Sequence, residues 1–119
     1  MSLTLREERP EDTRKIRALV TAAFGQPEEA DLVDALRTAN DLTLSLVAEE
    51  DGKIIGHIAL SRLKSPANSV ALAPVSVAPD RQGGGIGGAL IREAIARANA
   101  TGETLLFVLG DPAYYSRFG

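Results

Sequence analysis

Two alternating runs joined by the dipeptide Asp51-Gly52 constrain the fold more than any other feature of the sequence. Apolar residues alternate with other residues over positions 42–48 and again over positions 54–60. Because Asp-Gly between alternating runs is a strong signal of a β-hairpin, the middle of the chain is predicted to be antiparallel. The residues predicted to share one face of this hairpin are Leu42, Leu44, Leu46, Ala48, Ile54, Gly56, Ile58 and Leu60.

The segments on either side of the hairpin have the patterns of strands and helices. Alternation over residues 2–7 predicts a short strand, and Pro10 and Pro27 each begin a helical pattern. Residues 70–77 predict a third strand, inside which Pro74 lacks a ladder donor; this predicts a sheet edge, a bulge or a splayed pair of strands. The residues from Ala89 onward predict a helix. Residues 105–109 then predict a short buried strand.

This order of elements predicts the fold class. The sequence β-α-α-β-β-β-α-β is typical of an α/β (α+β) fold with a mixed central sheet, an antiparallel meander in its middle and flanking helices. The chain has 119 residues, which suits a single domain over residues 1–119. A hydrophobic content of 45% and a net charge of only -3 argue against disorder.

Composition also excludes several kinds of site and partner. The chain has no cysteine, which excludes disulfides and thiolate metal sites, and with His57 as its single histidine no metal site is predicted. No apolar run is long enough for a membrane span, and the first residues lack the pattern of a secretory signal. The acidic balance gives no reason to expect nucleic acid as a partner. We therefore expect a cytoplasmic protein that acts on a small molecule or another protein.

The most informative segment is Gln-Gly-Gly-Gly-Ile-Gly-Gly at positions 82–88, between the third strand of the meander and the next helix. Backbone N–H groups are exposed at such a helix start and the helix dipole is positive there, so the segment is predicted to bind an anion. Two other interpretations are a flexible loop and a dinucleotide site, since Gly83, Gly85 and Gly88 spell G-x-G-x-x-G. Against the dinucleotide site, residues 78–82 separate the strand from the first glycine, and an antiparallel hairpin precedes it.

Residues 75–90 resemble the central motif of the GNAT superfamily of N-acetyltransferases. In that motif a strand and a proline turn are followed by Gln/Arg-x-x-Gly-x-Gly/Ala at the start of a helix, and Gln82, Gly85 and Gly87 occupy the fixed positions. Residues 111–119, Asp-Pro-Ala-Tyr-Tyr-Ser-Arg-Phe-Gly, look like the family's tyrosine-containing helix start and are very similar to the ending of a subgroup of bacterial predicted N-acetyltransferases. The resemblance extends over the whole chain in element order and spacing.

The resemblance implies a GNAT-like acyl-CoA N-acyltransferase fold and an enzyme that uses acetyl-CoA as cosubstrate. The acetyl group would pass to an amine of a small molecule or protein by direct attack, through a tetrahedral intermediate. Tyr115 matches the family's tyrosine that protonates the departing thiolate, and a phenol with a pKa of about 10 keeps its proton at neutral pH. The residues that the resemblance assigns to cosubstrate binding, by pantetheine contact or by pyrophosphate contact, are Val75, Ser76, Val77, Gln82, Gly83, Gly84, Gly85, Ile86, Gly87 and Gly88.

Several roles stay open at this stage. Glu49 and Glu50 lie beside the predicted turn and are most simply solvated, whereas His57 is interpreted as a hydrogen-bonded structural residue on the face opposite Ile58. Arg81 either neutralises a phosphate or is a solvated turn residue. Two alternative functions are a non-catalytic acyl-CoA-binding or regulatory module and a dinucleotide-binding oxidoreductase domain.

Members of the family usually continue with a helix and two further strands after the tyrosine. The resemblance therefore implies that these C-terminal strands are missing here and that the strand over residues 105–109 is an open apolar edge. Open edges invite pairing with another chain. We accordingly expect either a fragment of a longer protein or a homodimer formed through this edge.

Overall fold

The computed structural model describes residues 3–62, 69–102 and 104–106. Its strands are β1 (Leu3–Glu7), β2 (Leu42–Glu50), β3 (Lys53–Arg62), β4 (Ser69–Val77) and β5 (Thr104–Leu106). Its helices are α1 (Thr13–Phe24), α2 (Glu28–Thr38) and α3 (Ile86–Ala100), with short 3-10 turns over Pro10–Asp12 and Pro79–Arg81. No helix among these residues is long and apolar enough to cross a membrane.

The strands form one mixed sheet in the order β1-β2-β3-β4-β5. The first three pairings are antiparallel and the last, between β4 and β5, is parallel. The hairpin predicted around Asp51-Gly52 is the β2–β3 pair, and both turn residues adopt positive φ angles, 52° and 80°. These observations confirm the predicted mixed sheet with an antiparallel meander.

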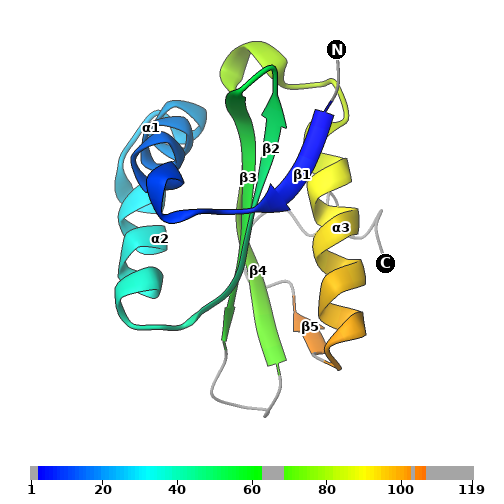
Figure 1. Cartoon of the computed structure of the whole chain (residues 1–119). Helices are drawn as coiled ribbons and strands as arrows, with labels where there is room; N and C mark the ends of the chain where they lie inside the picture. Colours follow the sequence, from blue (N-terminus) through cyan, green and yellow to red (C-terminus); the bar gives the residue numbers. More distant parts are fainter. Residues whose placement is uncertain (1–2, 63–68, 103, 107–119) are drawn as a thin grey trace.

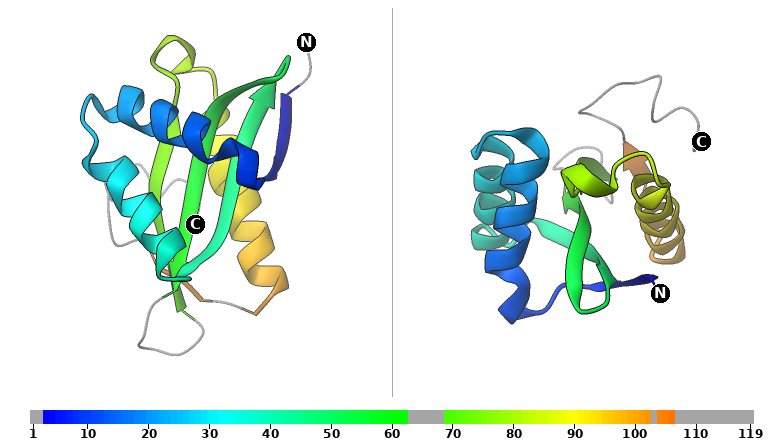
Figure 2. Two further views of the ribbon diagram at one scale, coloured as in Figure 1. Left: turned by 60° about the vertical axis from the view of Figure 1, so that its left-hand side comes forward. Right: turned by 90° about the horizontal axis from the view of Figure 1, so that it is seen from above.

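Helices cover both faces of the sheet. Figure 1 shows α1 and α2 on one side of the strands and α3 on the other, and the view from above in Figure 2 shows the same three layers. Gly25 ends α1 in the left-handed conformation at φ 72°, which glycine adopts without a steric cost. α3 begins at Ile86, so the last two glycines of the glycine-rich segment lie inside its first turn.

Each face of the sheet has its own apolar core. The larger, here called the α3 core, consists of Leu46, Ala48, Ile55, Ile58, Leu60, Val70, Leu72, Ile86, Leu90, Ile91, Ala94 and Ala98. The smaller, here called the α1 core, consists of Ile16, Val20, Ala30 and Val47, with Ile54 packed against it. β3 lies between the two cores, and its residues 55–60 are all buried.

Bulges change which side chains face α3. In β3, Glu49 pairs with Ile54 and Ala48 pairs with Gly56, so Ile55 is an extra residue. Ile54 therefore packs against the α1 core and Ile55 joins the α3 core. The prediction that Ile54 shares a face with Gly56 is thus wrong, because the bulge reverses the alternation. The prediction that Leu42 shares a face with Leu44 is wrong for the same reason, since Leu42 pairs with Ser61 and Leu44 with Leu60.

A second bulge lies in β4, where Leu72 pairs with Leu60 and Val75 pairs with Ile58. Two residues of β4 therefore lie opposite one residue of β3, and Pro74 is one of the two. This confirms the bulge among the three outcomes predicted for Pro74, because a residue without an N–H donor is tolerated where the ladder is interrupted.

Gly56 sets how closely α3 approaches the sheet. A methyl group at Gly56 would lie 3.0 Å from Ile86 Cγ2, 3.0 Å from Leu90 Cδ1 and 3.2 Å from Ala48 Cβ. These distances are shorter than ordinary van der Waals contacts between carbon atoms. The first turn of α3, which follows the glycine-rich segment, therefore packs on a position of β3 that has room only for glycine.

Candidate functional site

The site begins in the glycine-rich segment between β4 and α3. Gly83 and Gly85 have φ angles of 85° and 86°, and Gly85 is the residue that precedes the first turn of α3. Gly84 between them is not left-handed, and this alternation is typical of a backbone nest whose N–H groups converge on an anion. All three glycines are exposed, and a methyl group at Gly83 or Gly85 would meet no atom within 4 Å. Glycine is required at both positions by conformation rather than by lack of space.

Backbone donors are available at this turn. Ala89 N–H bonds to the Gly85 carbonyl at 3.0 Å, which is the first hydrogen bond of the α3 ladder. The N–H groups of Ile86, Gly87 and Gly88 belong to the first turn, where a helix offers no acceptor of its own. The helix dipole adds a positive potential at the same end. The turn therefore has the donors and the potential of an anion site.

Two side chains hold this turn to the end of the sheet. Gln82 donates from Nε2 to the Val77 carbonyl at 3.1 Å, and Arg81 forms an ion pair with Glu50 at the end of β2. The Arg81 hydrogen bond holds the pKa of Glu50 below its ordinary value. Glu50 is therefore ion-paired rather than simply solvated, because the turn after β4 lies beside the β2–β3 hairpin. Arg81 is paired with Glu50 and remains one-third exposed, and its role toward a phosphate stays a prediction.

The strand before the turn is β4, and its residues 75–77 pair with β3 along one edge. Val75 and Val77 pack half-buried against the α3 core, whereas Ser76 points to the opposite face and is 1% exposed. On one side these residues pair with β3, and the pairing of β4 with β5 covers only Ser69–Ala71. Within the described part of the chain, the second edge of β4 beyond Ala71 thus has no strand neighbour. Edge backbone of this kind can receive an extended ligand.

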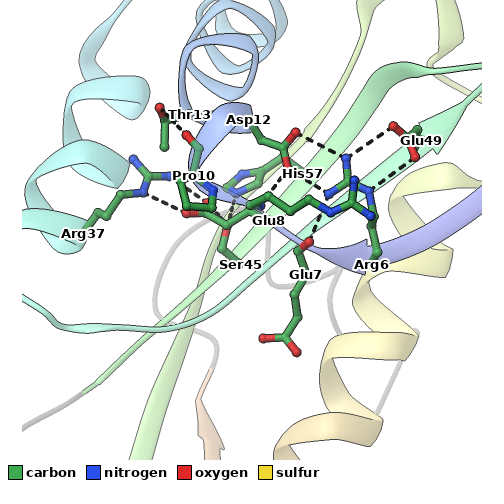
Figure 3. A network of polar contacts seen from close by, with 11 residues as sticks. Arg6, Glu7, Glu8, Pro10, Asp12, Thr13, Arg37, Ser45, Glu49 and His57 are labelled. Atoms are coloured by element: carbon green, nitrogen blue, oxygen red, sulfur yellow. Dashed lines mark hydrogen bonds and ion pairs between the residues drawn. The ribbon is translucent and has the colours of Figure 1, made fainter.

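A buried polar network lies on the other face of the sheet, under α1 (Figure 3). His57 on β3 is fully buried, and its Nε2 atom lies 2.7 Å from Ser45 Oγ on β2. Ser45 donates to Glu8 Oε1, and Glu8 accepts two further hydrogen bonds from Arg37, at 2.7 and 2.9 Å. His57 is therefore hydrogen-bonded, as predicted, and it lies on the face opposite Ile58.

Burial and charge set the ionisation of this network. Burial lowers the pKa of His57 to about 4, and the opposing effect of the Glu8 carboxylate does not offset it. Burial alone would raise the pKa of Glu8, but hydrogen bonds from Arg37 and Ser45 outweigh it and hold that pKa below its ordinary value. At neutral pH the network therefore contains a neutral imidazole and an ionised carboxylate.

A second ion-pair group lies beside the first. Arg6 on β1 contacts Asp12 at 2.8 Å and Glu49 at 3.3 Å (Figure 3). Hydrogen bonds from Arg6 hold the pKa of Asp12 and the pKa of Glu49 below their ordinary values. The interpretation of Glu49 as simply solvated is wrong, because β1 pairs with β2 and brings Arg6 alongside it.

The structure describes some of the remaining predicted residues and not others. Tyr115, the predicted proton donor, lies outside the described residues, so its role stays a prediction. The structure brings Gln82, the glycines and Ile86 together in one turn at the end of β4. Sequence reasoning missed Glu8, Ser45 and Arg37. The only local signal was Ser45, a small polar residue on the β2 face that alternates with Leu44 and Leu46.

Comparison with known proteins identifies the family. Residues 8–119 match the acetyltransferase (GNAT) family. The solved structure of a GNAT family acetyltransferase from Brucella melitensis in complex with acetyl-CoA is 49% identical, with a TM-score of 0.91 over 99% of this chain and 82% of that chain. The structure of Escherichia coli YhbS in complex with CoA is 38% identical, with a TM-score of 0.91 over 98% of this chain and 67% of that one.

A curated relative agrees with this assignment. The protein named uncharacterized N-acetyltransferase YjhQ, from Escherichia coli K12, is 41% identical over 116 residues. The match covers 91% of this chain and spans 64% of the length of YjhQ. The predicted family and fold class are thereby confirmed. The chain belongs to the GNAT family of acetyltransferases.

Proposed function

We propose that this chain transfers the acetyl group of acetyl-CoA to an amine of a small molecule or protein. The observation that carries the proposal is the turn at Gly83–Gly85, where two left-handed glycines lie exposed before the free N–H groups of α3. Such a turn suits the pyrophosphate of acetyl-CoA. Its place in a GNAT fold, with relatives solved in complex with acetyl-CoA and CoA, supports the same ligand.

The residues assigned by the motif fit this cosubstrate. The turn residues Gln82–Gly88 supply backbone donors for the pyrophosphate, and Val75–Val77 supply a strand edge beside which the pantetheine arm can lie. A backbone N–H of this strand can also polarise the thioester carbonyl and stabilise the oxyanion, an effect worth about 3 kcal/mol for one donor.

The chemistry requires two proton transfers. An alkyl amine has a pKa of about 10, so it is protonated at neutral pH and must lose a proton to attack the thioester. The C–N bond then forms, the tetrahedral intermediate collapses, and the departing thiolate takes a proton. We assign that second proton to Tyr115, whose phenol is protonated at neutral pH.

Calorimetric titration of the chain with acetyl-CoA, and with NADH as the control ligand, tests the assignment of the cosubstrate. Saturable binding of acetyl-CoA alone is expected. Binding of NADH without acetyl-CoA would support a dinucleotide site and refute the proposal. Binding of neither ligand by the folded chain would also count against it.

Turnover is measured as CoA release with a thiol reagent. The chain has no cysteine, so the protein itself gives no background in this assay. The acceptors to be used are lysine, spermidine, an aminoglycoside and a peptide with a free N-terminus. An enzyme releases CoA with at least one of them, whereas a non-catalytic acyl-CoA-binding module binds acetyl-CoA and releases none.

Replacing Tyr115 by phenylalanine tests the proton donor. We expect kcat to fall by about 100-fold, the size of a typical general-acid contribution, with the acetyl-CoA dissociation constant unchanged. Tyr114→Phe removes the neighbouring hydroxyl and is the matched control. Equal kcat values for the two variants would remove Tyr115 from the mechanism.

Two further proposals, on cellular location and on oligomeric state, come from the sequence alone. A cytoplasmic location is proposed from composition alone. Homodimer formation through the strand over residues 105–109 is proposed from its apolar sequence, and residues 107–119 lie outside the described part of the structure. A monomeric mass by light scattering at high concentration would count against the dimer.

A further inference from the structure

The glycine turn that suits an anion has almost no packing of its own. Gly83 and Gly85 are exposed, and a methyl group at either position would meet no atom within 4 Å. The nearest atom to a methyl group at Gly84 would be the Arg81 carbonyl oxygen, at 3.5 Å. Glycine also loses more conformational freedom on ordering than any other residue. Contacts outside the three glycines must therefore keep the turn in its anion-binding conformation.

The residues on either side of the glycine turn are held by the rest of the fold. After the turn, Ile86 is 6% exposed and belongs to the α3 core. Before the turn, Ala78 N–H donates to the Ile55 carbonyl and Arg81 N–H donates to the Ala78 carbonyl, both at 2.8 Å. The glycines thus connect a buried helix start to the end of a short 3-10 turn, and Arg81 is the last residue of that turn.

The Arg81 side chain joins the 3-10 turn to a different strand. It forms an ion pair with Glu50, the last residue of β2, at the end of the molecule where the β2–β3 hairpin turns (Figure 1). The Glu50 side chain is only 10% exposed, so its carboxylate is held in place by its surroundings. The contact from Gln82 to the Val77 carbonyl, in contrast, joins residues that are close in sequence. Glu50 therefore ties the start of the glycine turn to the far side of the meander.

We propose that Glu50 is a positioning residue for acetyl-CoA, which holds the glycine turn in its pyrophosphate-binding conformation through the ion pair with Arg81. The inference rests on the proposed function, because the pyrophosphate is the group assigned to this turn. A carboxylate does not bind an anion, so Glu50 acts on the ligand only through Arg81. The Arg81 hydrogen bond lowers the pKa of Glu50, so the carboxylate stays ionised at neutral pH.

Charge and geometry make opposite predictions for the loss of this carboxylate. A negative charge near an anion site repels the ligand, and Glu50 also neutralises the Arg81 guanidinium. On charge alone, Glu50→Gln should therefore tighten the binding of acetyl-CoA. If Glu50 positions the turn, the same substitution weakens binding, because the ligand must then order the glycines itself. The sign of the change in affinity distinguishes the two effects.

Calorimetric titration with acetyl-CoA measures this sign. We expect the dissociation constant to rise about fivefold in Glu50→Gln, the upper range for an ion pair near the surface. Glu93→Gln is the matched control, because it removes a carboxylate from an ion pair with Arg97, about two turns into α3. Its dissociation constant should stay within about twofold of wild type. An affinity in Glu50→Gln equal to or tighter than that of wild type would overturn the proposal.

A double-mutant cycle shows whether Glu50 acts through Arg81. Arg81→Met keeps an unbranched side chain of similar length but has no donor for the carboxylate. In the Arg81→Met background, we expect Glu50→Gln to have no further effect on the dissociation constant of acetyl-CoA, because the ion pair is already broken. Losses of affinity that add in the double variant would mean that Glu50 acts by another route and would refute the proposal.

A truncated cosubstrate separates positioning of the turn from general damage to the fold. S-acetyl-pantetheine carries the thioester but lacks the pyrophosphate, and the thiol assay follows its turnover as well. With the best acceptor of the panel, Glu50→Gln should raise the KM for acetyl-CoA about fivefold at unchanged kcat. Its kcat/KM for S-acetyl-pantetheine should equal that of wild type. An equal loss with both cosubstrates would mean that Glu50 supports the fold in general and would refute its role at the turn.

The turn can also be observed without any ligand. Backbone 15N relaxation reports fast motion of the amides of Gly83–Gly85. Their order parameters should fall in Glu50→Gln and stay at the wild-type values in Glu93→Gln. Unchanged order parameters in Glu50→Gln would overturn the proposal while the proposed function stands. If wild type binds no acetyl-CoA, it is the proposed function that fails, and the order parameters still test whether Glu50 holds the turn.

Discussion

At the scale of single residues, the burial of His57 has a consequence for stability. Its pKa is about 4 in the folded chain and about 6.5 when exposed, so the unfolded chain binds one more proton between these two values. The contribution of His57 to the free energy of unfolding is therefore fully present above about pH 6.5 and is lost as the pH falls toward 4. The loss is about 1.4 kcal/mol per pH unit within that window.

Urea unfolding at about pH 7 and about pH 5 measures this effect. We expect the free energy of unfolding to fall by about 2 kcal/mol in wild type, and His57→Gln to be much less pH-dependent because it does not titrate. The carboxylates of Glu8 and Asp12, whose pKa values lie below their ordinary ones, lose their contributions only at lower pH. Equal pH dependence in wild type and variant would show that His57 does not titrate as its burial requires.

In the glycine turn, substitution by alanine can distinguish the cost of a left-handed backbone from the cost of a steric contact. Gly85 has a φ of 86°, so Gly85→Ala forces an alanine into the left-handed region at a cost of about 1 kcal/mol. Gly84 is not left-handed, and a methyl group there would make an ordinary contact at 3.5 Å with the Arg81 carbonyl. We expect Gly85→Ala to weaken acetyl-CoA binding, measured by calorimetry, more strongly than the control Gly84→Ala. Equal affinities in the two variants would mean that the left-handed turn is not needed for binding.

At the scale of elements, the packing of α3 on β3 depends on Gly56. Because its neighbours lie within about 3 Å of an added methyl group, we expect Gly56→Ala to destabilise the chain by about 1 kcal/mol and Gly56→Val by about 3 kcal/mol. The graded loss is measured by urea unfolding. A valine as well tolerated as an alanine would show that Ile86 and Leu90 move aside at little cost.

The elements also show what the sequence could and could not predict. Alternation and the Asp-Gly turn predicted the β2–β3 hairpin, and Pro74 predicted the interruption of β4. The bulge at Ile55 could not be predicted from pattern, because Ile54 and Ile55 are both isoleucine and either one satisfies an apolar position. The pattern before Gly56 is therefore compatible with a regular strand, in which Ile54 faces α3, and with a bulged strand, in which Ile55 does.

The same limit applies to the candidate site. The glycine turn is contiguous in the sequence, so its motif predicted it. The contact between Glu8 and Arg37 joins residues 29 positions apart, and the contact between Ser45 and His57 joins the neighbouring strands β2 and β3. No local pattern encodes such pairings, since they depend on how α2 packs against β2 and on the register of the sheet.

At the scale of the whole molecule, the two cores differ in size. The α3 core contains residues from three antiparallel strands and one long helix, whereas the α1 core contains only a few side chains of α1, α2 and β2. Local opening costs less where fewer apolar contacts are broken. We therefore expect backbone amides of α2 to exchange with D₂O faster than those of β3, which is covered on both faces.

Hydrogen exchange read by NMR or mass spectrometry measures this order. The slowest amides should lie in residues 55–60 of β3 and in the middle of α3. Protection of α2 equal to that of β3 would mean that the two layers open together and that the smaller core is not the weaker one.

The bulges at Ile55 and at Ala73-Pro74 also bear on how the gene can change length. A single-residue deletion in a strand normally turns every following side chain to the other face of the sheet. At Ile55, and within the Ala73-Pro74 pair, a deletion would instead remove only the surplus residue and leave a regular ladder on both sides. Alignments of related sequences should therefore place one-residue gaps in these strands at those two points, and His57 and Ser76 would keep their common face across such gaps.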